Sequence, residues 1–172
     1  MVEAPSFALN IPAFAEGAMI PAKYTCDLPR VDVGKAGGEH ASPAIEISGV
    51  PDGTLSLALI MDDPDIPEVF KKDRGISEFV HWVLFNMPAT TTEIPEGSSV
   101  GVVGANGAGK NAYHPPCPPP QYEPSTHRYI FKLYALDATL PLQAGASAAE
   151  VQQAMEGHII AQTAYTGLYK RQ

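Results

Sequence analysis

Short apolar runs, separated by turn-forming residues, dominate the hydrophobic pattern of this chain. Three of them, at residues 54–62, 80–86 and 128–136, are rich in the Leu, Ile, Val and aromatic residues that favour β-strands. Apolar residues occupy both the odd and the even positions of each run, which point to opposite faces of a strand. We therefore expect these strands to be buried on both faces. Residues 44–48 alternate more weakly and lead into the turn GVPDGT, which predicts a fourth strand. The pattern therefore predicts a mainly β protein.

Helices have little room, because seventeen prolines and fifteen glycines are spread along the chain. One helix is predicted to begin at Ser147, which can form a capping box with Glu150. Its buried side chains follow at four-residue spacing, at Val151, Met155 and Ile159. No repeat or composition break divides the chain, although VDVGKAGGEHA is typical of a flexible insertion. We expect a single domain over residues 1–172.

Charge and composition narrow the classes of partner. Eleven Lys and Arg against nineteen Asp and Glu give a net charge of −8, which repels nucleic acid and anionic membrane surfaces at long range. Residues 1–14 lack the pattern of a signal peptide, and no later run reaches membrane-spanning length, so we expect a cytoplasmic protein. In that setting Cys26 and Cys117 are expected to be free thiols rather than a disulfide.

One motif resembles a nucleotide-binding loop. GANGAGKN, at residues 104–111, contains the G-x-x-x-x-G-K half of a phosphate-binding loop, but Asn111 replaces its final Ser or Thr. Phosphate binding there requires a helix directly after the lysine. The following sequence, AYHPPCPPPQYEP, is too rich in proline to form one. We therefore expect a glycine-rich turn without nucleotide affinity.

Polar residues gather in four other segments. The first is MDDPDIP, where Asp63 and Asp65 lie on a proline-stiffened loop after a strand. Turn formation alone would also explain this loop. The second is VHWVLFN, where alternation puts His81 on one face with Val83 and Phe85, and Trp82 on the opposite face in the core. His81 would be either a site residue or a core histidine paired with a carboxylate.

The third and fourth segments complete the set. YHPPCPPP forms a rigid wall with few amide donors, among them that of Cys117, although a proline-recognition ligand is an alternative reading. In HRYIFKLYALD, alternation puts His127 and Tyr129 on one face and Arg128 on the other. Two imidazoles, a phenol and carboxylates offer donors and a pH-sensitive positive charge, which suit a phosphate or carboxylate ligand.

The order of these segments resembles a known family. DPDIP, HWVLFN, Tyr-x-x-Pro-Cys-Pro-Pro and HRYIFKLYALD, in that order, are similar to the phosphatidylethanolamine-binding proteins, in particular to their bacterial and archaeal Raf-kinase-inhibitor-like branch. Further similarity runs almost from end to end, through IPAKYTCD, SPAIEISGVPDGTLSLALIMDDPD and LPLQAGAS. The resemblance implies two antiparallel sheets with Greek-key connections and a few peripheral helices.

The resemblance also implies a pocket for phosphate-like anions and phospholipid head groups. It assigns the following residues to that pocket: Asp63, Pro67, His81, Pro118, Pro119, His127 and Tyr129, with the backbone amide of Cys117 at its mouth. Asp65, Tyr113 and His114 take supporting positions, and the Ile66–Pro67 bond is a candidate for the cis form.

Two features depart from the family pattern. The bacterial branch usually reads Tyr-Gly-Gly-Pro-Cys-Pro-Pro, whereas this chain has His114 and Pro115 in place of the two glycines, which changes the shape of the pocket mouth. Segments 28–41 and 68–79 look like insertions that could cover the pocket or form the surface of a homodimer.

Three classes of function remain open. The first is a binding and regulatory module, without a cofactor, that captures an anion or head group and modulates a kinase or protease. The second is a weak hydrolase, in which Cys117 would be the nucleophile and His81 or His127 the base. The third is a metal site built from His81, His114, His127 and Asp63, although no dedicated zinc spacing is present. We expect binding rather than catalysis.

Overall fold

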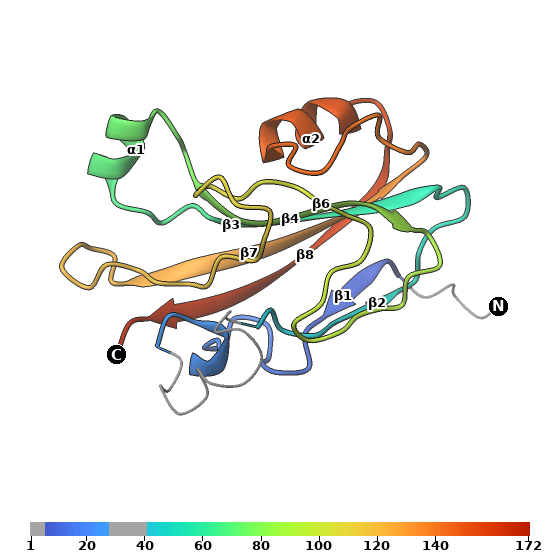
Figure 1. Ribbon diagram of the computed structural model, residues 1–172. Coiled ribbons are helices and arrows are strands. Elements are labelled where there is room, and N and C mark those ends of the chain that lie inside the picture. The colour runs from blue at the N-terminus through green and yellow to red at the C-terminus, as the bar shows by residue number, and fades with distance from the viewer. Residues whose placement is uncertain (1–5, 28–40) are drawn as a thin grey trace.

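Two antiparallel β-sheets form the body of the protein (Figure 1). The computed structural model describes residues 6–27 and 41–172. The larger sheet has the strand order β6-β4-β3-β7-β8 and contains β3 (Ser56–Asp63), β4 (Phe79–Pro88), β6 (Val102–Val103), β7 (Thr126–Leu136) and β8 (Ile159–Lys170). The smaller has the order β1-β2-β5 and contains β1 (Ala8–Asn10), β2 (Ile45–Ser48) and β5 (Glu93–Ile94). The prediction of a mainly β fold and its four strands is confirmed.

The connections follow a Greek key. β7 returns after β6 to pair with β3, so the four strands lie in the order β7-β3-β4-β6. β3 is therefore central, and all eight of its residues are buried. One face of the larger sheet packs on the smaller sheet through side chains such as Leu59, Trp82 and Phe131. The other face packs under α2 (Ala148–Met155) through Ile60, Val83 and Phe85.

Helix α2 begins as its sequence predicts. The Ser147 hydroxyl accepts from the Glu150 amide, the Glu150 carboxylate accepts from the Ser147 amide, and Val151 and Met155 are buried. The helix ends at Met155, however, so the prediction that it continues to Ile159 is wrong. Gly157 has a φ of 78°, a left-handed conformation that stops the helix, and Ile159 begins β8 with 43% of its surface exposed.

The sequence pattern did not reveal several elements, of which the longest strand, β8 (Ile159–Lys170), and the helix α1 (Glu68–Arg74) matter most here. β8 pairs with β7 from Ile159 to Lys170, and α1 follows Pro67 within one of the two expected insertions. α1 ends at Gly75, whose φ of 65° is left-handed. The other expected insertion, with VDVGKAGGEHA, lies outside the described residues except for Ala41.

Cys26 and Cys117 form a disulfide, with a Cα–Cα distance of 5.4 Å. The expectation of free thiols is therefore wrong. The fold brings the segment after η1 (Ala22–Tyr24) against the proline-rich segment, where the Cys26 amide donates to the Pro116 carbonyl at 3.1 Å. No helix among the described residues is long and apolar enough to cross a membrane.

The GANGAGKN stretch forms a turn, as predicted, and no helix follows Lys110. The glycines are needed for packing. A Cβ on Gly104 would lie 2.5 Å from the Ala146 carbonyl oxygen, and a Cβ on Gly107 would lie 2.7 Å from the ring of Phe79. This turn packs against β4 instead of presenting its amides to a phosphate.

Candidate functional site

A small cavity opens at the end of the larger sheet where β3 finishes and β7 starts. Its volume is about 140 Å³, several times the ~10–15 Å³ that one water needs and below the ~300 Å³ of a drug-sized pocket. A group of a few heavy atoms would fill it. The predicted site residues that line it are Asp63, His81, His114, Cys117, Pro118, Pro119, His127 and Tyr129.

Antiparallel pairing brings the two ends of the site together. Asp62 pairs with Ile130, so Asp63 at the end of β3 lies close to His127 near the start of β7. Alternation then directs His127 and Tyr129 to the face that Asp63 shares, while Arg128 is exposed on the other. These three residues of the cavity wall are almost fully buried, with exposed fractions of 3% for Asp63, 1% for His127 and 0% for Tyr129.

His81 reaches the cavity through a β-bulge. Met61 pairs with Trp82 but Asp62 pairs with Val80, so His81 is an extra residue in β4. A bulge of this kind turns a side chain away from the simple alternation of a strand. The ring of His81 consequently packs on Tyr129, with ring centroids 5.1 Å apart, on the side of the sheet that Trp82 occupies. The prediction that His81 shares a face with Val83 and Phe85 is therefore wrong, because those two side chains pack on the opposite side of the sheet.

The backbone of His114 holds His81 in place. The His114 amide donates to the His81 carbonyl at 2.8 Å, and Nδ1 of His81 lies 2.8 Å from the His114 carbonyl oxygen. A carbonyl oxygen only accepts, so Nδ1 carries the hydrogen. Burial lowers the pKa of His81 to about 3, and the ring is neutral near pH 7. Of the two imidazoles that the sequence offered as a source of positive charge, burial thus disfavours the charged form of His81.

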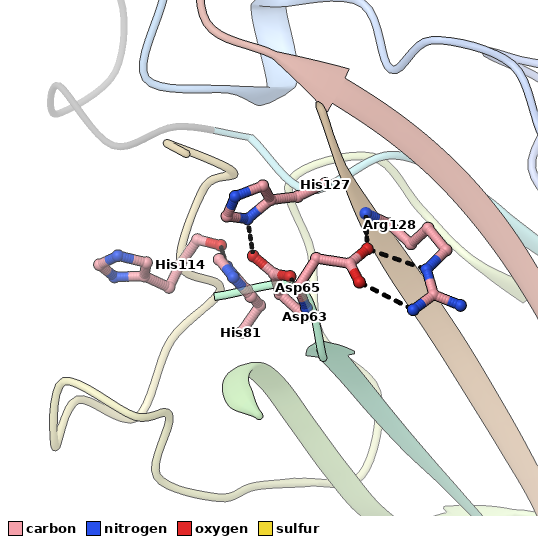
Figure 2. Close-up of polar contacts among 6 residues, drawn as sticks. All are labelled: Asp63, Asp65, His81, His114, His127 and Arg128. Carbon is pink, nitrogen blue, oxygen red and sulfur yellow. Dashed lines mark hydrogen bonds and ion pairs between the residues drawn. The ribbon is translucent and has the colours of Figure 1, made fainter. Parts of the chain in front are cut away.

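His127 has a different partner. Its Nδ1 lies 2.7 Å from Oδ2 of Asp63, and the second oxygen of Asp63 accepts from the Asp65 amide at 2.8 Å (Figure 2). Both Asp63 oxygens are thus used within the protein, and they fix the orientation of the His127 ring. Nε2 of His127 is buried and has no hydrogen-bond partner among the described residues. This nitrogen is an unsatisfied buried polar atom in the wall of the cavity.

Asp65 stabilises the loop after β3. Its carboxylate accepts from the Arg128 amide at 2.9 Å, from Nε at 2.8 Å and from Nη2 at 2.7 Å, and Figure 2 shows the guanidinium directed at it. These hydrogen bonds hold the pKa of Asp65 below its usual value. Arg128 is engaged on the outer side and contributes no charge to the cavity wall.

Two other candidate residues do not line the cavity. Pro67 is buried at the N-terminus of α1, where its carbonyl accepts from the amides of Phe70 and Lys71. The bond before it is trans, since the cis bond of the described residues is Glu123–Pro124. Tyr113 donates its hydroxyl hydrogen to the Tyr24 carbonyl at 2.9 Å, and so joins the pocket segment to η1.

Two residues of the wall were missed from the sequence. Ile66 and Phe79 both line the cavity, and the Phe79 ring packs against His81 with centroids 4.9 Å apart. Ile66 lies between Asp65 and Pro67 in the MDDPDIP loop, so its position next to candidate residues was a usable signal. Phe79 gives no such signal, because its place depends on pairing with Asp63.

The chemistry open to the cavity is limited by two observations. Cys117 is held in the disulfide, so it offers no thiolate nucleophile while that bond is intact. Among the described residues, no group of three His, Cys, Asp or Glu side chains is arranged to hold a metal ion. The cavity instead offers imidazole nitrogens within aromatic and proline walls.

Comparison with known proteins gives a consistent result. Residues 10–170 match the family model described as phosphatidylethanolamine-binding protein. A UPF0098 protein of Methanothermobacter thermautotrophicus is 40% identical, over 95% of this chain and 98% of its own length. A UPF0098 protein of Chlamydia pneumoniae is also 40% identical, over 93% of this chain and 96% of its own. These names indicate no enzymatic activity.

Two solved structures have the same fold. A phosphatidylethanolamine-binding protein homologue from Chlamydia trachomatis superimposes with a TM-score of 0.82 at 35% identity, covering 97% of this chain and 99% of that one. YbcL of E. coli, described as a new member of the mammalian family, gives a TM-score of 0.78 at 27% identity, covering 98% of this chain and 100% of its own.

Proposed function

Because this chain belongs to the phosphatidylethanolamine-binding protein family, we propose that its pocket binds a small anion, either a free phosphate-like or carboxylate ion or the head group of a phospholipid. The observation that carries the proposal is Nε2 of His127, which is buried at the cavity without a partner among the described residues. A buried polar atom left unpaired costs about 1–3 kcal/mol, and a ligand oxygen would remove that cost.

The partner of His127 suits an anion in particular. When the ring carries a second proton, Nε2 becomes a donor and the carboxylate of Asp63, 2.7 Å from Nδ1, balances the charge. None of the described lining residues is Lys or Arg, so we expect weak affinity, in the micromolar to millimolar range of about 4–8 kcal/mol.

The regulatory part of the proposal is that the occupied pocket modulates a protein target such as a kinase or protease. The pocket mouth is formed by loops, namely the segment after β3 and the segment 113–120, and loops of this kind commonly carry recognition. Inhibition assays against representative kinases and proteases, with and without phosphate, test this part independently of binding.

An NMR titration with phosphate, acetate and phosphoethanolamine tests the proposal. We expect the ring signals of His127 to shift and to saturate. His127→Asn is the informative variant, because the amide nitrogen of Asn can keep the contact with Asp63 while Nε2 is lost. His158→Asn is the matched control, since His158 makes an exposed pair with Asp137 at 2.8 Å, at the far end of β7. Unchanged His127 signals at high ligand concentration would refute the anion pocket.

The disulfide bears on the cellular compartment in which the protein would carry out this function. Persistent disulfides are characteristic of oxidising compartments, whereas the sequence led us to expect the cytoplasm. Counting free thiols in protein that is trapped with an alkylating reagent at cell lysis would show whether Cys26 and Cys117 are joined in the cell. A cytoplasmic protein is expected to yield two reactive thiols, and an exported one none.

A further inference from the structure

The two histidines of the pocket both leave Nε2 for a ligand, but these two nitrogens differ in hydrogen-bonding role. Nδ1 of His81 is committed to the His114 carbonyl oxygen at 2.8 Å and must carry the single hydrogen of the neutral ring. Nε2 of His81 therefore carries a lone pair and can only accept a hydrogen bond. At His127 the hydrogen on Nδ1 faces a carboxylate, so that ring can gain a second proton and donate from Nε2.

The surroundings of His81 oppose any change in this assignment. Its ring is 4% exposed and packs against the rings of Phe79, His114 and Tyr129. The charged forms of His114 and His127, which face it across the pocket, both disfavour a proton on His81. Asp63, the carboxylate of the cavity, is already bonded to His127 and to the Asp65 amide. His81 thus remains an acceptor.

Building on the proposed anion site, we infer that His81 makes the pocket selective for ligands that combine an anionic oxygen with a hydrogen-bond donor, and against bare oxyanions such as sulfate. The anionic oxygen accepts from Nε2 of His127, and the donor is directed at Nε2 of His81. A phosphate monoester monoanion supplies this donor as P–OH. A phospholipid head group has a diester phosphate without a hydrogen, so its ammonium group must supply it.

The physical basis is the cost of placing two acceptors against each other. A sulfate oxygen next to the lone pair of His81 would leave both atoms unpaired in a buried site, while both would be hydrogen-bonded in water. Sites built around one polar group reject ligands that cannot complement it. We expect phosphate to bind at least about tenfold more tightly than sulfate at about pH 6, where a large share of a phosphate monoester is the monoanion.

Calorimetry on the wild-type protein with four probes at constant ionic strength tests the inference. Methyl phosphate and glycerophosphoethanolamine carry both groups, whereas sulfate and dimethyl phosphate carry no donor. We expect at least one of the first pair to bind at least about tenfold more tightly than either member of the second. Comparing methyl phosphate with glycerophosphoethanolamine then distinguishes a free phosphate from a lipid head group as the source.

The possible outcomes separate the inference from the proposed function. Equal affinity for sulfate and methyl phosphate would overturn the role of His81 but leave the anion pocket standing. Absence of binding by all four probes would overturn both. His81→Asn, whose amide can still donate to the His114 carbonyl, should raise the affinity for sulfate relative to methyl phosphate. Nitrogen chemical shifts of His81 in the wild type provide a measurement that needs no variant, and a protonated Nε2 would refute the inference.

Discussion

His81 and His114 are joined by two hydrogen bonds of 2.8 Å, one from amide to carbonyl and one from imidazole to carbonyl. The pair links the bulge of β4 to the proline-rich segment. Because both bonds on the His114 side use its backbone, the hydrogen bonding of His81 depends on the main chain of residue 114.

A comparison of two substitutions at residue 114 tests this dependence. His114→Pro removes the amide that donates to the buried His81 carbonyl, whereas His114→Ala retains both backbone groups. We expect the proline variant to be less stable than the alanine variant by about 1–3 kcal/mol in denaturant unfolding. Equal free energies of unfolding would show that the amide bond contributes little.

The stability of the protein should depend on His81 in acid. The unfolded ring takes up a proton near its ordinary pKa of 6.5, while burial holds the folded pKa at about 3. The contribution of His81 to the free energy of unfolding is therefore fully present above about pH 6.5. It is lost as the pH falls towards 3, by up to roughly 4–5 kcal/mol.

Urea unfolding of the wild type and of His81→Asn at pH 7 and pH 4 isolates this contribution. The asparagine variant cannot titrate but can keep the bond to the His114 carbonyl, so it should lose less stability on acidification. An identical loss in both proteins would assign the acid sensitivity to other groups.

The disulfide should contribute strongly to stability. It joins residues separated by 91 positions, and closing a loop of that length in the unfolded chain is worth about 4–5 kcal/mol in the chain-entropy model. The Cys26→Ser, Cys117→Ser double variant should lose up to this amount in denaturant unfolding. The reduced wild type is the control, and it should match the double variant. A loss below about 1 kcal/mol would show that the cross-link has little effect.

The glycine-rich turn should be sensitive at Gly107 and tolerant at Lys110. An added Cβ at Gly107 would meet the ring of Phe79, which lines the cavity, so Gly107→Ala should cost about 1–3 kcal/mol and weaken ligand binding. Lys110→Ala should change neither. We also expect no complex with ATP and magnesium by calorimetry, and a micromolar complex abolished by Lys110→Ala would contradict the structural role of this turn.

The sequence predicted the strands whose composition is strongly apolar, because burial on both faces of β3 and β4 leaves few alternatives. β7 was predicted as well, although it is buried on one face and half-buried or exposed on the other. The sequence did not reveal β8, whose first six residues, IIAQTA, show no regular alternation of apolar and polar residues and are exposed or half-buried. Gly167 in that strand is a close-packing position, where a Cβ would lie 2.6 Å from Ile20. That requirement comes from a segment far away in the chain and is invisible in local pattern.

Within the pocket, sequence could identify residue types but not their geometry. Strict alternation places His127 and Tyr129 correctly, since β7 pairs with β3 without a bulge there. The same rule fails at His81, where one extra residue in β4 reverses the facing of its side chain. The disulfide was missed because the expectation rested on cellular context, whereas its formation depends on the fold bringing Cys26 beside Cys117.

The cross-link also determines how the protein would respond to mechanical force. If handles were attached at Ser6 and Gln172, tension would pass from Cys26 to Cys117 through the sulfur atoms and bypass β2 to β6. Strands β3 and β4, which carry Asp63 and His81, would lie outside the covalent path of the tension, while β7, which carries His127, lies on it. Cleavage of the bond would lengthen the fully extended tether by roughly 300 Å, given the separation of 91 positions at ~3.3–3.6 Å per residue.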